Sequence, residues 1–561
     1  MRSKSLLAAF ACLCSLSFGS GEQDAAKSRK TSKHPHVIFF LIDDAGYADF
    51  GYNSDDLTEF SPNMDAAAAD GIKLTNYYTQ EQCTPARASL LTGKYPTKVG
   101  MQFSTPDLPE PWGLPLEFTI LPEVLKFVGK YKTEMVGKWH LGFSKDAFLP
   151  ENRGFDNFFG YYYGKESYYD HQVTATVLDG SRSLFNDMHF NGRNVEALGR
   201  HSTEIFQGRV EEILSNHDVG EPLFLFYSHQ LVHVPLENPP DEFFTEAELE
   251  LAETIDKVSR RVVGKMLMTV DKMFAHLVDN LKANGMYDNS IIVVTSDNGG
   301  CSYYMGGNQP LRGEKNTVYE GGVKVNAFVH SPLFPEDVQG TTLDCMVHNV
   351  DWLPTILKGA VGWDGDLGPL DGVNHWDGIV SADKSAAACP RAEMIHQLEV
   401  GNTWQGVRGV DTLRAALRMG DLKLVYGQHE LGWWSDREFS SESCDATNAY
   451  WPYWGYVFDL SVDPSEKHNL MDIVDDYVLS RMWQRLDYYF VNMANPSWRA
   501  QDINARTVWS QNDFWIRPWV SDEDLVSPRD PWQEQMKEGN TLTIHDGHNH
   551  PERDLTSRTA G

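Results

Sequence analysis

The sequence predicts an α/β fold, with a large mixed, mostly parallel sheet sandwiched by helices and a smaller C-terminal α+β domain that contains an antiparallel sheet. Continuous apolar runs at 37–42, 222–227 and 291–294 are typical of parallel strands that are buried on both faces. Apolar residues with helical spacing at 204–214 and 258–283 separate these runs, so strands and helices alternate. Short strands bounded by turn residues appear only late in the chain, which places the antiparallel sheet there.

Polar side chains follow two of the buried runs. Asp43 and Asp44 end the first run, and Asp297 and Asn298 follow the third. Because ligands of such folds bind at the carboxyl ends of the strands, these four side chains are expected to converge. Oxygen ligands without His or Cys suit Ca²⁺ or Mg²⁺, and a carboxylate-rich, flexible set favours Ca²⁺. The alternative is that residues 297–300, Asp-Asn-Gly-Gly, form an ordinary turn.

The later part of the chain carries the smaller domain. Small, featureless residues at 382–388 mark a boundary, and short strands are predicted at 412–419, 422–426 and 456–460, with a helix over 476–493. We expect five Trp residues to pack an extended tail against the domains: Trp498, Trp509, Trp515, Trp519 and Trp532. The predicted organisation is a signal peptide at 1–21, a mobile leader at 22–35, a catalytic domain at 36–385, the antiparallel-sheet domain at 386–519 and a disordered tail at 520–561.

Charge and length limit the class of protein. With 561 residues the chain is too long for one ordinary core, so two domains are expected. The net charge of −31 disfavours nucleic acid or an anionic membrane as the main partner. An anionic substrate would therefore need a few Lys, Arg and His residues and a metal ion to dominate the field inside its pocket.

The N-terminus predicts secretion. Arg2 and Lys4 precede an apolar stretch at 6–18 and a small-residue exit, as in a secretory signal. An uncleaved membrane anchor would need a longer apolar run, and we expect no membrane span. No permitted Asn-x-Ser/Thr acceptor occurs, since Asn495 is followed by Pro496. Export or the secretory-pathway lumen is therefore favoured over a lysosome-like compartment.

Four cysteines remain for disulfides, because Cys12 and Cys14 leave with the signal and Cys83 is assigned to chemistry below. These are Cys301, Cys345, Cys389 and Cys444, and in an oxidising compartment they allow three pairings. Cys389 with Cys444 is the preferred pair, since both lie in the later part of the chain.

The run Cys83-Thr84-Pro85-Ala86-Arg87 continues into Leu91-Thr92-Gly93-Lys94. Pro85 suits a first helical turn, because the backbone amides there have no partner within the helix and proline lacks the amide hydrogen. Residues 86–91 are acceptable helix formers. Residue 83 is therefore expected at a helix N-terminus, where backbone amides favour an anion. A lone cysteine is more often a small buried apolar residue, and only the longer run makes the pattern specific.

This run resembles the signature of sulfatases, in which the cysteine is oxidised during secretion to formylglycine by a formylglycine-generating enzyme. The blocks at 136–142 (Val-Gly-Lys-Trp-His-Leu-Gly), 296–300, 310–315 and 319–323 are similar to further sulfatase blocks. Their order and spacing resemble the arylsulfatase B group, within the alkaline phosphatase superfamily, and the resemblance extends from about His36 to Leu470.

The resemblance implies a role for each matching residue. The implied calcium ligands are Asp43, Asp44, Asp297, Asn298 and the modified Cys83. Arg87 would hold the formylglycine, while the sulfate would be surrounded by Lys138, His140, His233 and Lys315. His229 competes with His233, because Val234 departs from the family pattern, and Arg312 is a cationic alternative to Lys315.

The implied function is a secreted, calcium-dependent sulfatase that acts on a sulfated carbohydrate or an aryl sulfate. The arylsulfatase B likeness points to N-acetylgalactosamine 4-sulfate. One hydroxyl of the hydrated aldehyde would attack sulfur, and the second would then expel sulfate and restore the aldehyde. Two alternatives stay open at this point: a phosphonate or phosphodiester hydrolase of the same superfamily, and a non-catalytic protein that binds sulfated glycans.

Overall fold

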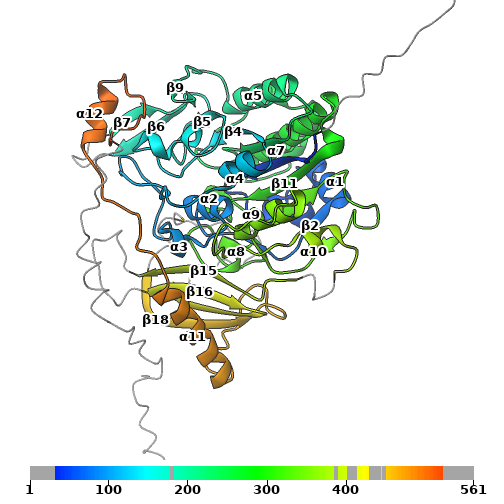
Figure 1. Cartoon of the computed structure of the whole chain (residues 1–561), viewed down its shortest axis with the longest axis vertical. Coiled ribbons are helices and arrows are strands. Elements are labelled where there is room, and N and C mark those ends of the chain that lie inside the picture. The colour runs from blue at the N-terminus through cyan, green and yellow to red at the C-terminus, as the bar shows by residue number, and fades with distance from the viewer. Residues whose placement is uncertain are drawn as a thin grey trace, which may run out of the picture.

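Five adjacent parallel strands form the centre of the molecule, and their carboxyl ends meet at one edge (Figure 1). The computed structural model describes residues 32–176, 182–384, 389–400, 413–428, 444 and 450–521. The predicted signal peptide, most of the leader, Trp532 and nearly all of the predicted tail lie outside the described residues. In the described part of the chain, no helix combines the length and the apolar character needed to cross a membrane.

Within the described residues, the large sheet has ten strands in the order β13, β2, β12, β11, β1, β10, β4, β5, β8, β9. The strand bounds, in chain order, are β1 His36–Ile42, β2 Ile72–Leu74, β3 Tyr77–Tyr78, β4 Lys132–Lys138, β5 Asn157–Tyr161, β6 Gln172–Thr176, β7 Arg182–Asn186, β8 His189–Phe190, β9 Arg193–Asn194, β10 Leu223–Ser228, β11 Ser290–Ser296, β12 Ala327–His330, β13 Thr342–Leu343 and β14 Val347–His348. Strands β11, β1, β10, β4 and β5 run parallel to their neighbours in this series, whereas β12 and β8 pair antiparallel to the series.

Helices cover both faces of this sheet. Their bounds are α1 Pro62–Asp70, α2 Cys83–Thr92, α3 Pro96–Val99, α4 Leu121–Val128, α5 Ser202–Asn216, α6 Glu246–Glu253, α7 Val258–Ala283, α8 Glu320–Val323, α9 Trp352–Pro354 and α10 Trp376–Val380. Successive residues of β1 point to opposite faces: Phe39 joins a core with residues of α2 and α4, and Phe40 a core with residues of α5 and α7. Both cores are apolar, which explains why the strand lacks polar alternation.

The smaller sheet is antiparallel and lies below the large one in Figure 1, in yellow. Its order is β15 Glu393–Val400, β16 Leu413–Met419, β17 Leu422–Gln428 and β18 Tyr450–Asp459, and α11 Asp476–Val491 packs on β15 and β16. The predicted fold class is confirmed. Strand β15 was not predicted, because the first strand expected after the boundary at 382–388 was the one at 412–419.

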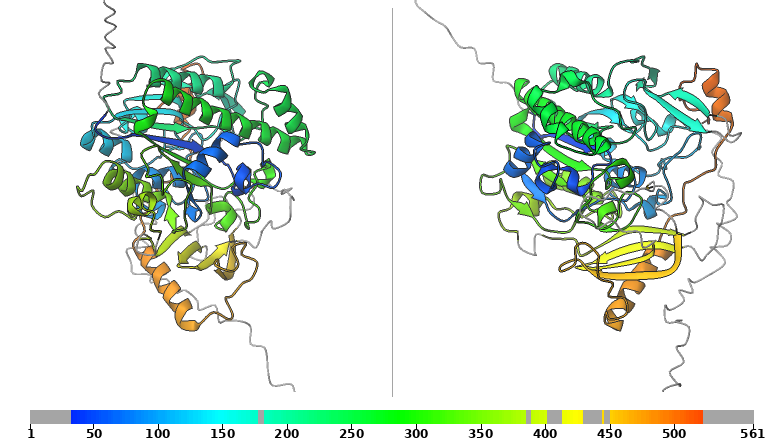
Figure 2. Two further views of the ribbon diagram at one scale, coloured as in Figure 1. Left: turned by 90° about the vertical axis from the view of Figure 1, so that its right-hand side faces the viewer. Right: turned by 180° about the vertical axis from the view of Figure 1, so that it is seen from behind.

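The chain after α11 returns along the larger part of the molecule and passes through α12 Asn504–Ser510, which lies beside β6 and β7 (Figures 1 and 2). Ala494 N donates to Thr97 O over 2.6 Å, and Trp519 N donates to Ser144 O over 2.9 Å. Trp509 packs edge-on against Phe185, with 5.0 Å between ring centroids. The expectation that these Trp residues pack an extended segment against the domains is confirmed for the described ones.

Two disulfides join the later chain to the large sheet region. Cys301 pairs with Cys444, and Cys345 pairs with Cys389. The predicted pair Cys389–Cys444 is therefore wrong. Closeness in sequence was a poor guide, because Cys444 itself lies against the loop after β11, where Asn316 Nδ2 donates to Cys444 O over 3.2 Å.

Candidate functional site

The predicted acid pairs meet because β1 and β11 are neighbours in register. Ile42 lies opposite Ser296, so Asp43 and Asp297 leave the sheet side by side. The backbone N of Asp44 donates to Asp297 Oδ1 over 3.2 Å, and Asn298 Nδ2 donates to Asp44 Oδ1 over 2.7 Å. All four side chains are buried. Residues 297–300 are therefore more than an ordinary turn, because Asp297 and Asn298 join Asp43 and Asp44 in a single cluster at the strand ends.

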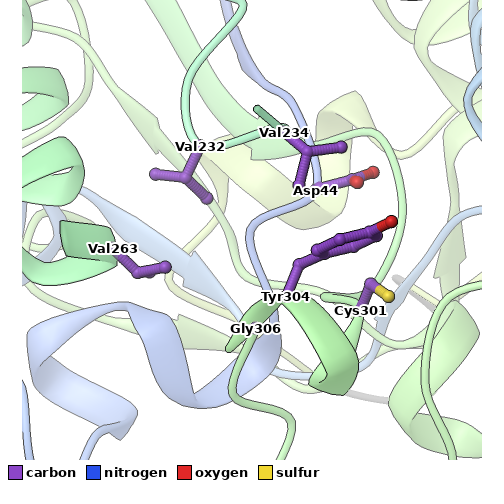
Figure 3. A pocket seen from close by; sticks show the side chains of 7 residues that line it. All are labelled: Asp44, Val232, Val234, Val263, Cys301, Tyr304 and Gly306. Carbon is purple, nitrogen blue, oxygen red and sulfur yellow. The ribbon is translucent and has the colours of Figure 1, made fainter. Parts of the chain in front are cut away.

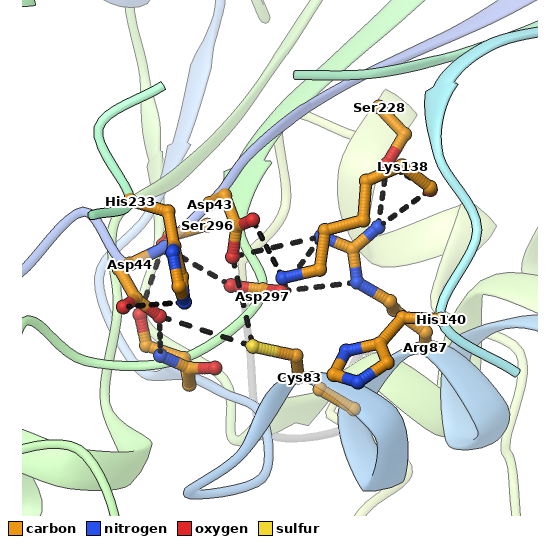
Figure 4. Close-up of polar contacts among 12 residues, drawn as sticks. Asp43, Asp44, Cys83, Arg87, Lys138, His140, Ser228, His233, Ser296 and Asp297 are labelled. Atoms are coloured by element: carbon orange, nitrogen blue, oxygen red, sulfur yellow. Dashed lines mark hydrogen bonds and ion pairs between the residues drawn. The ribbon is translucent and has the colours of Figure 1, made fainter. Parts of the chain in front are cut away.

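Cys83 is the first residue of α2, as the sequence predicted, and faces this cluster (Figure 4). Its Sγ lies 3.6 Å from Asp43 Oδ1, 3.9 Å from Asp44 Oδ1 and 3.6 Å from Lys315 Nζ. Burial, with the charge of Asp297, raises the pKa of the Cys83 thiol well above its ordinary value. The encoded thiol is therefore protonated at neutral pH and is a weak nucleophile.

Arg87 lies one helical turn after Cys83 and uses three nitrogens to tie the strand ends together. Nε and Nη2 donate to Asp297 Oδ2 over 3.1 and 2.8 Å. Nη1 donates to Lys138 O over 3.0 Å and to Ser228 Oγ over 2.5 Å. Although burial raises the pKa of Asp297, Arg87 and then Lys138 outweigh burial and hold this pKa below its ordinary value.

Lys138 ends β4, which is separated from β1 by β10, and its side chain reaches across to β1. Its Nζ donates to Asp43 Oδ2 over 2.6 Å, and neither side chain is exposed. Gly137 before it has φ +105°, and a Cβ there would lie 1.8 Å from Ser228 O, so this strand end requires glycine. Burial raises the pKa of Asp43, and the charge of Lys138 offsets only part of this rise.

His140 and Asp44 lie on opposite sides of Cys83 (Figure 4). The backbone of His140 is in the left-handed region, at φ +59°. Its carbonyl accepts from Thr84 Oγ1 over 2.8 Å, and a Cβ on Gly164 would lie 2.5 Å from the ring carbon Cε1. Within the described residues, its buried Nδ1 has no hydrogen-bond partner. Burial, followed by the charge of Lys138, lowers the pKa of His140 well below its ordinary value, so the ring is neutral at pH 7.

His233 reaches the acids, and its competitor His229 does not. His233 Nε2 lies 3.5 Å from Asp44 Oδ2, whereas His229 is enclosed between the rings of Phe40 and Tyr227 at centroid distances of 4.4 and 4.1 Å. Burial and then the charge of Lys315 lower the pKa of His233 well below its ordinary value. The structure thus separates two histidines that the sequence left as alternatives.

Lys315 likewise reaches the cluster and Arg312 does not. Lys315 Nζ donates to both carboxylate oxygens of Asp44 over 2.7 Å. Arg312 lies 4.0 Å over the ring of Tyr319 and donates to Glu466 O over 3.1 Å. Burial lowers the pKa of Lys315, but Asp44 and the other negative groups around it together raise this pKa well above its ordinary value.

One residue of the cluster was missed by the sequence interpretation. Ser228, the last residue of β10, accepts from Arg87 and donates through Oγ to Lys138 O over 2.9 Å. It lies opposite Gly137 in the parallel pairing of β10 and β4. Its position directly after the buried run at 222–227 was the available signal, but the predicted strand stopped one residue earlier.

The donor set fits a metal ion. Ligand atoms of Asp43, Asp44, Cys83 and His233 all lie within 4.8 Å of one another, and all four residues are buried. Asn298 Oδ1 is buried and, within the described residues, has no hydrogen-bond partner, so it can still act as a ligand. Carboxylate and amide oxygens suit a hard divalent cation, and the lysines and Arg87 compensate the acids.

A small cleft opens beside Asp44 (Figure 3). It is lined by Asp44, Val232, Val234, Val263, Cys301, Tyr304 and Gly306. One wall is charged and the others carry apolar side chains and an aromatic ring.

Comparisons with known proteins agree with this geometry. The family described as Sulfatase matches residues 35–362. Arylsulfatase J of Mus musculus is 37% identical over 530 residues, which cover 90% of this chain and 83% of the relative. Arylsulfatase A of Homo sapiens is 29% identical over 464 residues, covering 78% of this chain and 84% of the relative. The crystal structure of Ps i-CgsB in complex with k-i-k-neocarrahexaose is 25% identical, with a TM-score of 0.67, and covers 86% of this chain and 98% of that chain.

Proposed function

The chain belongs to the sulfatase family and is a sulfuric ester hydrolase, and we propose that it hydrolyses the sulfate ester of a sulfated carbohydrate. In this proposal the nucleophile is a formylglycine made from Cys83, and Ca²⁺ binds in the acid cluster. N-acetylgalactosamine 4-sulfate is the proposed sugar, and a simple aryl sulfate is the proposed laboratory substrate. The Ps i-CgsB complex supports a carbohydrate, since that protein holds a neocarrahexaose on a similar fold.

The placement of Cys83 carries the proposal. Its side chain is 2% exposed and lies against Asp43, Asp44 and Lys315, the position required of a nucleophile. Yet burial keeps the encoded thiol protonated, so the thiol itself is poorly suited to attack sulfur. A hydrated aldehyde at this position would supply the attacking hydroxyl and a second hydroxyl to release sulfate.

Calcium would be held by Asp43, Asp44, Asp297, Asn298 and the modified residue 83. Bound there, it would supply a positive charge that polarises the sulfate oxygens. Arg87 orients Asp297 through two hydrogen bonds and so holds this acid in place. We assign to Arg87, in addition, the task of holding the modified side chain one turn before it.

The remaining cations bind and orient the sulfate. Lys138 and Lys315 each lie about one hydrogen-bond length from an acid of the cluster, and both can donate to a sulfate oxygen placed beside Cys83. His140 and His233 are neutral in the free site because burial and the lysines lower their pKa. An anionic substrate favours the protonated imidazole, which can then give a proton to the leaving oxygen.

Secretion completes the proposal. The basic start and apolar stretch at 1–21 would direct the chain to the compartment where a formylglycine-generating enzyme acts, and the two disulfides are consistent with an oxidising compartment. Lys138 and Lys315, which pair with the acids of the cluster, would favour a sulfated substrate locally within a chain of net charge −31.

Aryl sulfate turnover by the purified protein, beside Cys83→Ala and Cys83→Ser, tests the proposal. We expect the wild type to hydrolyse the sulfate and both variants to lose at least about 10³-fold of its rate, because each lacks the aldehyde. Mass spectrometry of the peptide containing residue 83 should show loss of the thiol and gain of an aldehyde. Equal rates for wild type and Cys83→Ala would refute the nucleophile, and faster turnover of a matched phosphate diester would refute the sulfate ester as substrate.

A further inference from the structure

The segment before Cys83 is joined directly to the segment after Lys315. Glu81 lies two residues before Cys83 and is fully buried. Its backbone O accepts from the backbone N of Asn316 over 2.9 Å, and Lys315 N donates to Gly300 O over 3.1 Å. The start of α2 and the loop that carries Lys315 therefore share one main-chain contact.

Arg414 of the small sheet binds both of these segments. This side chain is 3% exposed and comes from β16. Its Nη2 donates to Glu81 Oε1 over 2.9 Å, and its Nη1 donates to Asn316 O over 2.8 Å. Its Nε donates to Glu399 Oε1 over 2.8 Å, which anchors the guanidinium on the neighbouring strand β15. A single planar group thus spans the two segments that present Cys83 and Lys315.

Two more contacts from the same side reinforce this arrangement. Gln397 of β15 donates through Nε2 to Glu81 Oε1 over 2.5 Å. Asn316, whose φ is +71°, donates through Nδ2 to the carbonyl of Cys444, and Cys444 is bonded to Cys301 at the start of the same loop. The loop from 301 to 316 is therefore held at both ends by residues of the C-terminal part.

We propose that Arg414 is a positioning residue, which sets the distance between residue 83 and Lys315 from outside the catalytic part of the molecule. The inference rests on the proposed function, since it assigns a role relative to that nucleophile. Arg414 acts only through Glu81 and Asn316. Its planar fork matters, because it holds Glu81, Asn316 and Glu399 at fixed angles to one another, which an ammonium group on a flexible stem would not do.

The expected effect is on the rate of the chemical step. A displacement of about 1 Å between a nucleophile and the groups around it can cost roughly 10²-fold in rate. Loss of the Arg414 contacts leaves the Glu81 carboxylate buried beside Cys83 without its cation, so the start of α2 is free to shift. Lys138, His140 and His233, which Arg414 does not contact, still bind the sulfate, and KM should therefore change less than kcat.

The experiment compares Arg414→Met, Glu81→Gln and the double variant with Arg391→Met. Arg391 is the matched control, because it is also buried and also joins the later chain to the large part, with Nε donating to Asp351 Oδ2 over 2.9 Å. Aryl sulfate turnover is expressed per modified residue 83, counted by mass spectrometry, and urea unfolding is followed by Trp fluorescence. Arg414→Met and Glu81→Gln should each lower kcat about 10- to 100-fold, and Arg391→Met should stay within about 3-fold of wild type at a comparable loss of stability.

The double variant distinguishes positioning from general destabilisation. If Arg414 acts through Glu81, the double variant should be no slower than the slower single variant, because both changes break the same link. Should Arg414→Met fail to fold, Glu81→Gln decides the question by itself. A kcat per modified site equal to that of Arg391→Met overturns the inference, whereas a silent wild type would instead overturn the proposed function on which it depends.

Discussion

Removing the guanidinium of Arg87 should destabilise the fold more than any surface charge does. The change Arg87→Met keeps an unbranched apolar stem but removes two hydrogen bonds to Asp297 and those to Lys138 O and Ser228 Oγ. Arg87 is 1% exposed and Asp297 is 2% exposed, so the carboxylate is left buried with its main cation gone. Breaking a buried pair in this way costs about 3–5 kcal/mol of unfolding free energy.

The pH dependence of this loss has a definite sign. Arg87 holds the pKa of Asp297 below its ordinary value. The Arg87–Asp297 pair therefore contributes fully to the unfolding free energy above the unfolded-state pKa of about 3.9, and this contribution is lost as the pH falls through the folded-state pKa of Asp297. The gap in unfolding free energy between wild type and Arg87→Met should therefore be full at pH 7 and should narrow below about pH 4.

Urea unfolding followed by Trp fluorescence measures the gap, with a chelator present so that no metal pairs with Asp297. Arg200→Met is the control, because Arg200 is 62% exposed in its side chain and lies 3.7 Å from Glu204. A surface pair of this kind contributes about 0–1 kcal/mol. If the two variants lose the same unfolding free energy at pH 7, the argument that Arg87 neutralises a buried acid is refuted.

Three further predictions concern the metal, a disulfide and a histidine. A calcium chelator should abolish aryl sulfate turnover and lower the melting temperature, and added Ca²⁺ should restore both; an unchanged melting temperature would contradict a cation among Asp43 and Asp44. Cys301→Ser should cost about 2–5 kcal/mol of unfolding free energy and leave Cys444 open to alkylation, whereas unchanged stability and no labelling would argue against the Cys301–Cys444 pair. His36→Gln should remove a loss of unfolding free energy at acid pH, because burial, with His217, lowers the pKa of His36 to about 4. Between pH 6.5 and pH 4, the unfolding free energy of the wild type should fall relative to that of the variant by up to about 3 kcal/mol. Parallel curves for the two proteins would contradict it.

The local sequence was sufficient for the fold class and for most of the site. Runs such as 37–42 are apolar at every position, and only a strand covered on both faces allows this. Because parallel strands end at a common edge, Asp43 and Asp297 could be brought together before any contact was known. Cys83 could be placed at a helix start from Pro85 and its neighbours alone.

Tertiary structure decided every choice between similar residues. His233 over His229 and Lys315 over Arg312 depend on which side chain reaches Asp44, a distance that sequence spacing does not contain. The pairing of Cys301 with Cys444 spans 143 residues of chain, and proximity in sequence pointed elsewhere.

The contacts of Arg414 also could not be predicted from the spacing of residues in the sequence. Residue type and spacing determine local conformation, so the sequence by itself determined the strands, the helix that begins at Cys83 and the acids at the strand ends. Contacts between segments far apart in the chain depend on how the two sheets pack, and Arg414 meets Glu81 across 333 residues only in the folded molecule.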